Sequence, residues 1–118
     1  MRPNDTSTVQ LGRIARARSG DKGTGANVGV FVPSDDLYAL VREQLTADRV
    51  ADFFRPLGVA GVTRYELPNL RALNFVLKGV LGRITRVDAQ GKALGQAILE
   101  VPIELPARLL PSNDPRGS

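Results

Sequence analysis

The chain has 118 residues, a size typical of one domain, and it contains neither cysteine nor histidine. This composition excludes disulfides, thiolate chemistry and imidazole-based catalysis, and we expect no metal site and no cofactor. The net charge of +4, from 16 Lys and Arg against 12 Asp and Glu, favours anionic partners. None of the four Phe and two Tyr lies among the arginines of residues 13–18, so we do not expect nucleic acid to be one of these partners.

The two ends of the chain are polar or rich in proline. Residues 1–8 lack the apolar core of a signal peptide, and no apolar run is long enough to span a bilayer, so we expect a cytoplasmic protein without membrane contact. Pro106, Pro111 and Pro115 lie among small polar residues. We therefore predict disorder in residues 1–8 and 106–118, with a single domain over residues 9–105.

The first part of that domain reads as two strands joined by a glycine-rich loop. Residues 9–18 alternate between apolar and polar side chains except near Arg13 and Ile14, and Gly12 just before them predicts a bulge. Residues 27–32 predict a second strand, which Pro33 ends.

Two capped helices should follow. Ser34 can cap the first helix, whose apolar stripe contains Leu37, Leu40, Val41 and Leu45. Thr46 can cap a shorter helix in which Val50, Phe53 and Phe54 recur at helical spacing before Pro56. These apolar side chains are expected to pack on the sheet as core.

A strand over residues 61–67 and a third helix over residues 70–81, capped by Asn69, come next. On a helical wheel Arg71, Asn74 and Lys78 form one narrow polar stripe, and the remaining surface is apolar. That surface is wider than one sheet needs, so we expect this helix to lie at an interface with a partner.

The last part of the domain is less regular. Residues 82–88 predict a strand and residues 88–91 a turn, and then Leu94, Ala97, Ile98 and Val101 fit helical spacing, with a hairpin return strand as the alternative. Ile103 to Leu105 predict a short edge strand between Pro102 and Pro106.

Glycine, charge and small polar groups are densest between Arg16 and Asn27. Glycines at 20, 23 and 25 allow successive backbone N–H groups to converge on an anion, and Lys22, Arg16 and Arg18 would add positive charge. The same residues also suit a well-made structural turn, because Ser, Thr and Asn often cap their own backbone. An anion-binding loop and a plain turn are both open.

Several segments, in the same order along residues 10–101, resemble the C-terminal domain of the acyclic terpene utilisation (AtuA-like) proteins: Ala17-Arg18-Ser19-Gly20-Asp21-Lys22-Gly23, Ala26-Asn27-Val28-Gly29-Val30, Arg64-Tyr65-Glu66-Leu67-Pro68 and Ala72-Leu73-Asn74-Phe75-Val76-Leu77. The resemblance implies an α+β, two-layer sandwich of ferredoxin-like fold, with helices on one face of a mainly antiparallel sheet. In that family the domain normally follows a larger domain or accompanies it as a short chain. Two segments depart from the family pattern: Thr24-Gly25 replace the common Asn-Asp, and Arg83-Ile84 follow Gly82 where glycines are usual.

Polar positions shared with the family motifs, together with the neighbouring loop glycines, form the predicted ligand-binding set: Ser19, Gly20, Asp21, Lys22, Gly23, Asn27, Glu66 and Asn74. The resemblance implies a stand-alone accessory domain that docks on a larger AtuA-like chain and helps to bind an anionic acyl-CoA-type intermediate of terpene catabolism. One alternative is a small lyase or hydratase with Asp21 or Glu66 as base and Lys22 as electrostatic stabiliser. The other is a homo-oligomeric module without a ligand.

Overall fold

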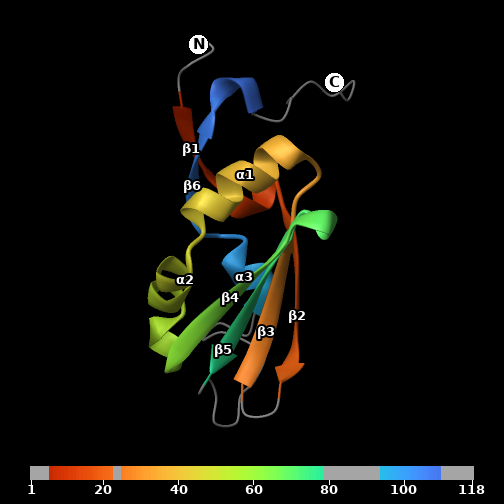
Figure 1. The fold of residues 1–118 in the computed structure, drawn as a ribbon. Helices are drawn as coiled ribbons and strands as arrows, with labels where there is room; N and C mark the ends of the chain where they lie inside the picture. The colour runs from red at the N-terminus through yellow and green to blue at the C-terminus, as the bar shows by residue number, and fades with distance from the viewer. Residues whose placement is uncertain (1–5, 23–24, 79–93, 110–118) are drawn as a thin grey trace.

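The computed structural model describes residues 6–22, 25–78 and 94–109, and in these ranges the chain forms two antiparallel sheets and three α-helices (Figure 1). The larger sheet has the strand order β2-β3-β5-β4, and the smaller sheet pairs β1 with β6. The strands are β1 (Thr6–Gln10), β2 (Arg16–Lys22), β3 (Gly25–Phe31), β4 (Gly61–Leu67), β5 (Ala72–Lys78) and β6 (Pro102–Pro106); the helices are α1 (Asp35–Gln44), α2 (Ala47–Phe53) and α3 (Leu94–Ile98). The predicted α+β class is confirmed.

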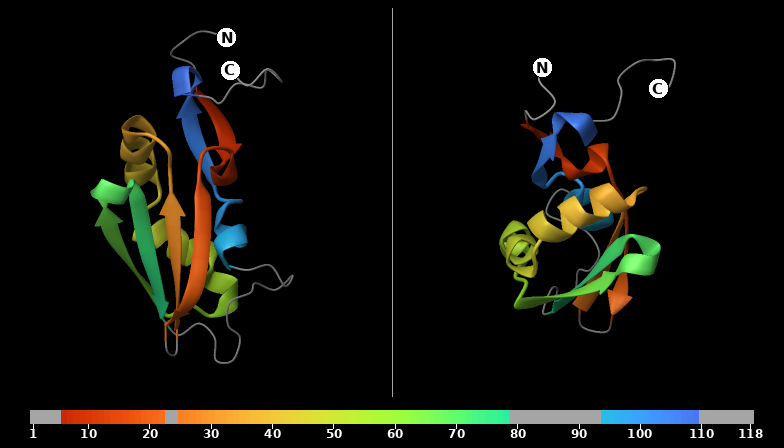
Figure 2. Two further views of the ribbon diagram at one scale, coloured as in Figure 1. Left: turned by 90° about the vertical axis from the view of Figure 1, so that its right-hand side faces the viewer. Right: turned by 45° about the horizontal axis from the view of Figure 1, so that its top comes forward.

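The core lies between the larger sheet and the helices. Alternate residues of a strand point to opposite faces, and the paired residues Val28 and Phe75 mark the face that is buried against the helices. Leu37, Val41 and Val50 belong to the same core cluster from the helix side. No helix of the described residues covers the opposite face, as the left view of Figure 2 shows, where the strands lie in front of α2.

The caps predicted for the first two helices are present, and these two helices lie where the sequence placed them. Ser34 Oγ accepts a hydrogen bond of 3.2 Å from the Leu37 N–H, and Thr46 Oγ1 accepts one of 3.1 Å from the Arg49 N–H. Each bond satisfies a backbone donor that a helix start leaves without an intrahelical partner. The core assignment is confirmed for Val41, Leu45, Val50 and Phe54, which are buried, while Leu40 and Phe53 are only partly buried against the core.

The prediction of a third helix over residues 70–81 is wrong. Residues 72–78 form the strand β5, paired with β3 on one side and β4 on the other. Pro68–Leu70 form a single 3-10 turn, η3, and Arg71 follows with φ 49°, a left-handed conformation that interrupts a helix and sets the chain into the sheet. β5 has an apolar core face, and Ala72 and Val76 lie on its other face, so its nearly continuous apolar run resembles that of a buried helix. The partner inferred from that helix loses its basis, and its predicted end, residues 79–81, lies outside the described residues.

The first predicted strand is also wrong in part, because it is two strands separated by a 3-10 turn. Leu11–Arg13 form this turn, η1, where the sequence predicted a bulge, and Leu11 is fully buried. The N–H groups of Leu11 and Gly12 each donate a 2.8 Å hydrogen bond, to the carbonyls of Val101 and Leu99 respectively. The turn therefore carries the chain from the small sheet to the large one.

The C-terminal elements agree with the sequence where they are described. Leu94–Ile98 form a helix, not a hairpin strand, and β6 contains the predicted edge strand. The strand and turn predicted for residues 82–91 lie outside the described residues. β1 starts at Thr6, and a 3-10 turn, η4, covers Ala107–Leu109, so regular structure extends into both segments where the sequence predicted disorder. Within the described ranges no helix has the length and apolar character of a membrane span.

Helix α3 packs directly on the backbone of β2, and Gly95 is the residue that allows this approach. A Cβ placed on Gly95 would lie 3.2 Å from the carbonyl carbon of Arg18 and 3.2 Å from the backbone nitrogen of Ser19. Both atoms belong to a strand that is hydrogen-bonded along its length to β3, so neither can move aside at small cost.

Replacing Gly95 with Ala is therefore expected to destabilise the domain by about 1 to 3 kcal/mol through overpacking, although alanine is otherwise the better helix former. Gly61→Ala is the matched control, since a Cβ there meets no atom within 4 Å. Urea denaturation of both variants gives the two changes in the free energy of unfolding. Equal free energies of unfolding for the two variants would show that α3 and β2 can move apart at little cost.

Candidate functional site

The candidate site is the face of the four-stranded sheet that carries no helix, which we call the open face. The strand register places one row of side chains across all four strands: Arg18 on β2, Gly29 on β3, Asn74 on β5 and Tyr65 on β4. A neighbouring row contains Gly20, Asn27, Val76 and Thr63. In the first row the two central positions, Gly29 and Asn74, are small or polar, and the larger Arg18 and Tyr65 stand on the edge strands.

Two predicted site residues, Asn27 and Asn74, meet on the open face. The Asn27 side-chain amide donates a hydrogen bond of 3.2 Å to Asn74 Oδ1, from β3 to β5. Gly20 lies opposite Asn27 on β2, and a Cβ there would be 3.1 Å from Asn27 Oδ1. Gly20 thus leaves room for the Asn27 amide to lie flat across the sheet. Both amides retain donor and acceptor capacity for a ligand after this one bond.

Aromatic and apolar groups surround these amides. The Phe31 ring lies over Gly29, because a Cβ on that glycine would come within 3.2 Å of Phe31 Cε2. On the other edge of the face Tyr65 is 52% exposed and Leu67 40% exposed, and Leu70 in the following turn is 62% exposed. These three residues form an apolar surface, which we call the β4 patch.

The charge on the open face is positive. Arg16, Arg18 and Lys78 are exposed there, and no carboxylate lies among the described side chains of this face. Within the described part of the chain, no hydrogen bond or ion pair engages the guanidinium of Arg16 or Arg18. A cavity of about 360 Å³ lies beside both guanidinium-bearing residues and is lined by Arg16, Ala17, Arg18 and Phe31.

Two other predicted site residues lie on the helix-covered side of the sheet. Ser19 pairs with Val28, a core residue, and so faces away from Asn27. Glu66 accepts a hydrogen bond of 2.9 Å from Arg64, whose guanidinium also donates to the carbonyls of Arg42 and Leu45 at 2.5 and 3.0 Å. Arg64 thereby satisfies carbonyls at the end of α1, and Glu66 supports this structural contact.

The predicted loop is shorter than the sequence implied. Asp21 and Lys22 belong to β2, paired with Ala26 and Gly25, so the backbone from Gly20 to Lys22 lies in a sheet ladder and not in an open nest. The prediction of a loop within residues 16–27 is wrong for Gly20, Asp21 and Lys22, which belong to β2. Gly23 and the side chains of Asp21 and Lys22 lie outside what the structure describes. Their role as ligand-binding residues stays a prediction.

Sequence reasoning missed Phe31, Tyr65 and Gly29 as parts of the site. Strand alternation alone could have placed Phe31 on the same face as Asn27, since the two residues are four positions apart in one strand. Tyr65 lies beside Asn74 because β4 pairs with β5. The sequence pattern predicts a helix at β5, so it gives no indication of this pairing.

These features define an α+β domain with a helix-free, cationic sheet face. The chain matches the family of the AtuA ferredoxin-like domain over residues 9–104, which is most of its length, and it belongs to that family. Comparisons with curated proteins and with solved structures gave no match.

Proposed function

We propose that this domain is an accessory binding module that holds the anionic part of an acyl-CoA-type intermediate on its open face and docks on a larger chain. One observation carries the proposal. Arg16 and Arg18 stand exposed on the same face of β2 beside the Phe31 ring, with no carboxylate among the described side chains of that face.

The chemistry of these groups suits phosphate and nucleotide. A guanidinium binds phosphate oxygens through two parallel N–H donors, and an aromatic ring offers a surface on which a base can stack. The amides of Asn27 and Asn74 add neutral donors and acceptors in the middle of the face. An acyl-CoA carries phosphates, an adenine base and amide groups, so it matches all three kinds of contact.

The same geometry favours binding over proton transfer. Amides and guanidinium groups do not act as bases at neutral pH, and Glu66, one of the two carboxylates considered for that role, is paired with Arg64 on the other side of the sheet. The β4 patch supports the docking part of the proposal, because three large apolar side chains exposed together are typical of a protein contact surface.

Replacing Arg18 with Ala should weaken coenzyme A binding about tenfold to a hundredfold, the effect expected for the loss of a charged hydrogen-bond donor to phosphate. Isothermal titration calorimetry of the domain with coenzyme A, alone and together with a larger chain of the AtuA-like type, measures the change. Arg55→Ala is the charge-matched control, since Arg55 lies in the η2 turn and pairs with Asp52. Equal affinities of the two variants, or no binding by the wild-type domain in either setting, would refute the proposal.

A further inference from the structure

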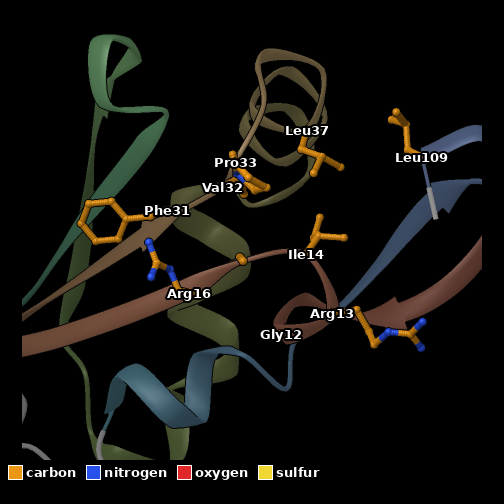
Figure 3. Close-up of a pocket in the computed structure, with 10 residues that line it drawn as sticks. Gly12, Arg13, Ile14, Arg16, Phe31, Val32, Pro33, Leu37 and Leu109 are labelled. Carbon is orange, nitrogen blue, oxygen red and sulfur yellow. The ribbon is translucent and has the colours of Figure 1, made fainter. Parts of the chain in front are cut away.

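A second, larger cavity opens next to the cationic edge of the sheet (Figure 3). Its volume is about 580 Å³, within the range of small-molecule sites. Ile14 lines it between η1 and β2, Val32 and Pro33 line it after β3, and Leu37 lines it from α1. Leu109 of η4, which is half-buried, forms part of its wall as well. In Figure 3 the side chains of Ile14 and Leu37 point into one space, and Leu109 lies to one side of it.

Hydrogen bonds and an ion pair fix the walls of this pocket before any ligand arrives. η1 is held by its two bonds to the carbonyls of Leu99 and Val101. On the opposite wall the Val32 N–H donates to the carbonyl of Arg71 at 3.0 Å, and the Arg71 side chain pairs with Asp35 at 2.8 Å. A preformed apolar pocket binds a ligand at a lower cost in conformational entropy than a pocket that must form on binding.

The pocket has a cationic end, and this end belongs to the candidate site. Arg16 and Phe31 line the large cavity and also the smaller cavity beside Arg18. Figure 3 shows the Arg16 guanidinium next to the Phe31 ring, on the opposite side of the pocket from Leu37 and Leu109. An apolar space therefore continues into a positively charged one, with Arg16 and Phe31 at the junction.

We infer that the large pocket receives the apolar chain of an acyl ligand while Arg16 and Arg18 hold its anionic group. The ligand class is an amphipathic acyl anion: either a free carboxylate, whose charge adjoins the acyl chain, or a coenzyme A thioester, whose charge lies on the phosphates beyond the pantetheine arm. The inference rests on the proposed function for the cationic end, and it adds that the apolar pocket selects ligands by the size of their acyl chain.

The test uses decanoate, decanoyl-CoA and coenzyme A as probes of the intact domain, with affinities measured by calorimetry. Decanoate should bind, and affinity should rise about three- to fourfold per methylene along a series of shorter carboxylates, as expected for burial of apolar surface. Decanoyl-CoA should bind more tightly than coenzyme A. In NMR spectra of the wild-type protein, decanoate should shift the methyl signals of Ile14 and Leu37 and leave those of Leu70 unchanged.

Leu109→Trp fills the pocket from η4 and should reduce decanoate affinity about tenfold, since it removes room for about two methylenes, with coenzyme A affinity unchanged. Ala60→Trp is the control and should change neither affinity, because Ala60 is exposed before β4 and lines neither cavity. The inference is overturned if decanoate does not bind, if the methyl shifts appear elsewhere, or if a folded Leu109→Trp binds decanoate like wild type. Loss of coenzyme A binding alone, with decanoate still in the pocket, refutes the proposed function and leaves the pocket assignment standing.

Discussion

Replacing Phe75 with Glu is expected to unfold the domain. Phe75 lies in the central strand β5, is 0% exposed, and pairs with Val28 on one side and Arg64 on the other. The change removes a core ring, at a cost of about 3 to 5 kcal/mol, and places a carboxylate in apolar surroundings at a further cost of several kcal/mol. Together these losses are comparable to the whole stability of a typical domain, about 5 to 15 kcal/mol. The neighbouring Arg64 guanidinium is already bonded to the end of α1 and to Glu66, so pairing with the new carboxylate would compete with those bonds.

Val76→Glu is the matched control, because Val76 is the next residue in the same strand but is only half-buried on the open face. Circular dichroism and proton NMR spectra at 25 °C should show a folded Val76→Glu protein and an unfolded Phe75→Glu protein. Folded Phe75→Glu protein with altered assembly would contradict the core position of this ring and would instead indicate an interface.

Phe54→Ala should lower the free energy of unfolding by about 3 to 5 kcal/mol, as is usual for truncation of a buried aromatic residue. Phe54 is 1% exposed and belongs to the core cluster, and its ring meets that of Phe53 edge to face at a centroid distance of 5.1 Å. Phe53 is only partly buried, so Phe53→Ala should cost clearly less. Urea denaturation of the two variants makes the comparison, and equal losses would show that both rings contribute alike to the core.

The sequence predicted α1, α2 and β4 well because each has a clear beginning and a one-sided pattern. Ser34 and Thr46 mark the two helix starts, and Pro68 follows the last residue of β4. Local hydrogen bonding and side-chain spacing determine such elements, so they can be read without knowledge of the tertiary structure.

The sequence failed at β5 because the burial of this strand depends on partners far along the chain. β3 and β4 cover its edges, the helices cover one of its faces, and Val76 and Ala72 leave the other face partly apolar. A short apolar run of this kind has no period that separates a buried strand from a helix. Arg71, just before this strand, has a left-handed backbone conformation that an arginine in the sequence does not predict.

Only part of the site can be predicted from the sequence, because its geometry also depends on strand partners that are far apart in the chain. Gly20, Asn27 and Asn74 were named from their motifs, but only the register of β2, β3 and β5 shows that they meet on one face. Ser19 is adjacent to Gly20 in sequence and lies on the opposite face, since neighbouring strand residues alternate.

The pairing of β1 with β6 has a consequence for the order in which the domain is completed during synthesis. Thr6 pairs with Pro106, so β1 emerges from the ribosome early and stays without its strand partner until nearly all of the described chain has followed. The hairpins β2–β3 and β4–β5 join strands close in sequence and can form sooner, because closing a short loop costs less entropy. We therefore expect the small sheet to close last, with its closure bringing β6 and η4, with Leu109, to their places at the large pocket.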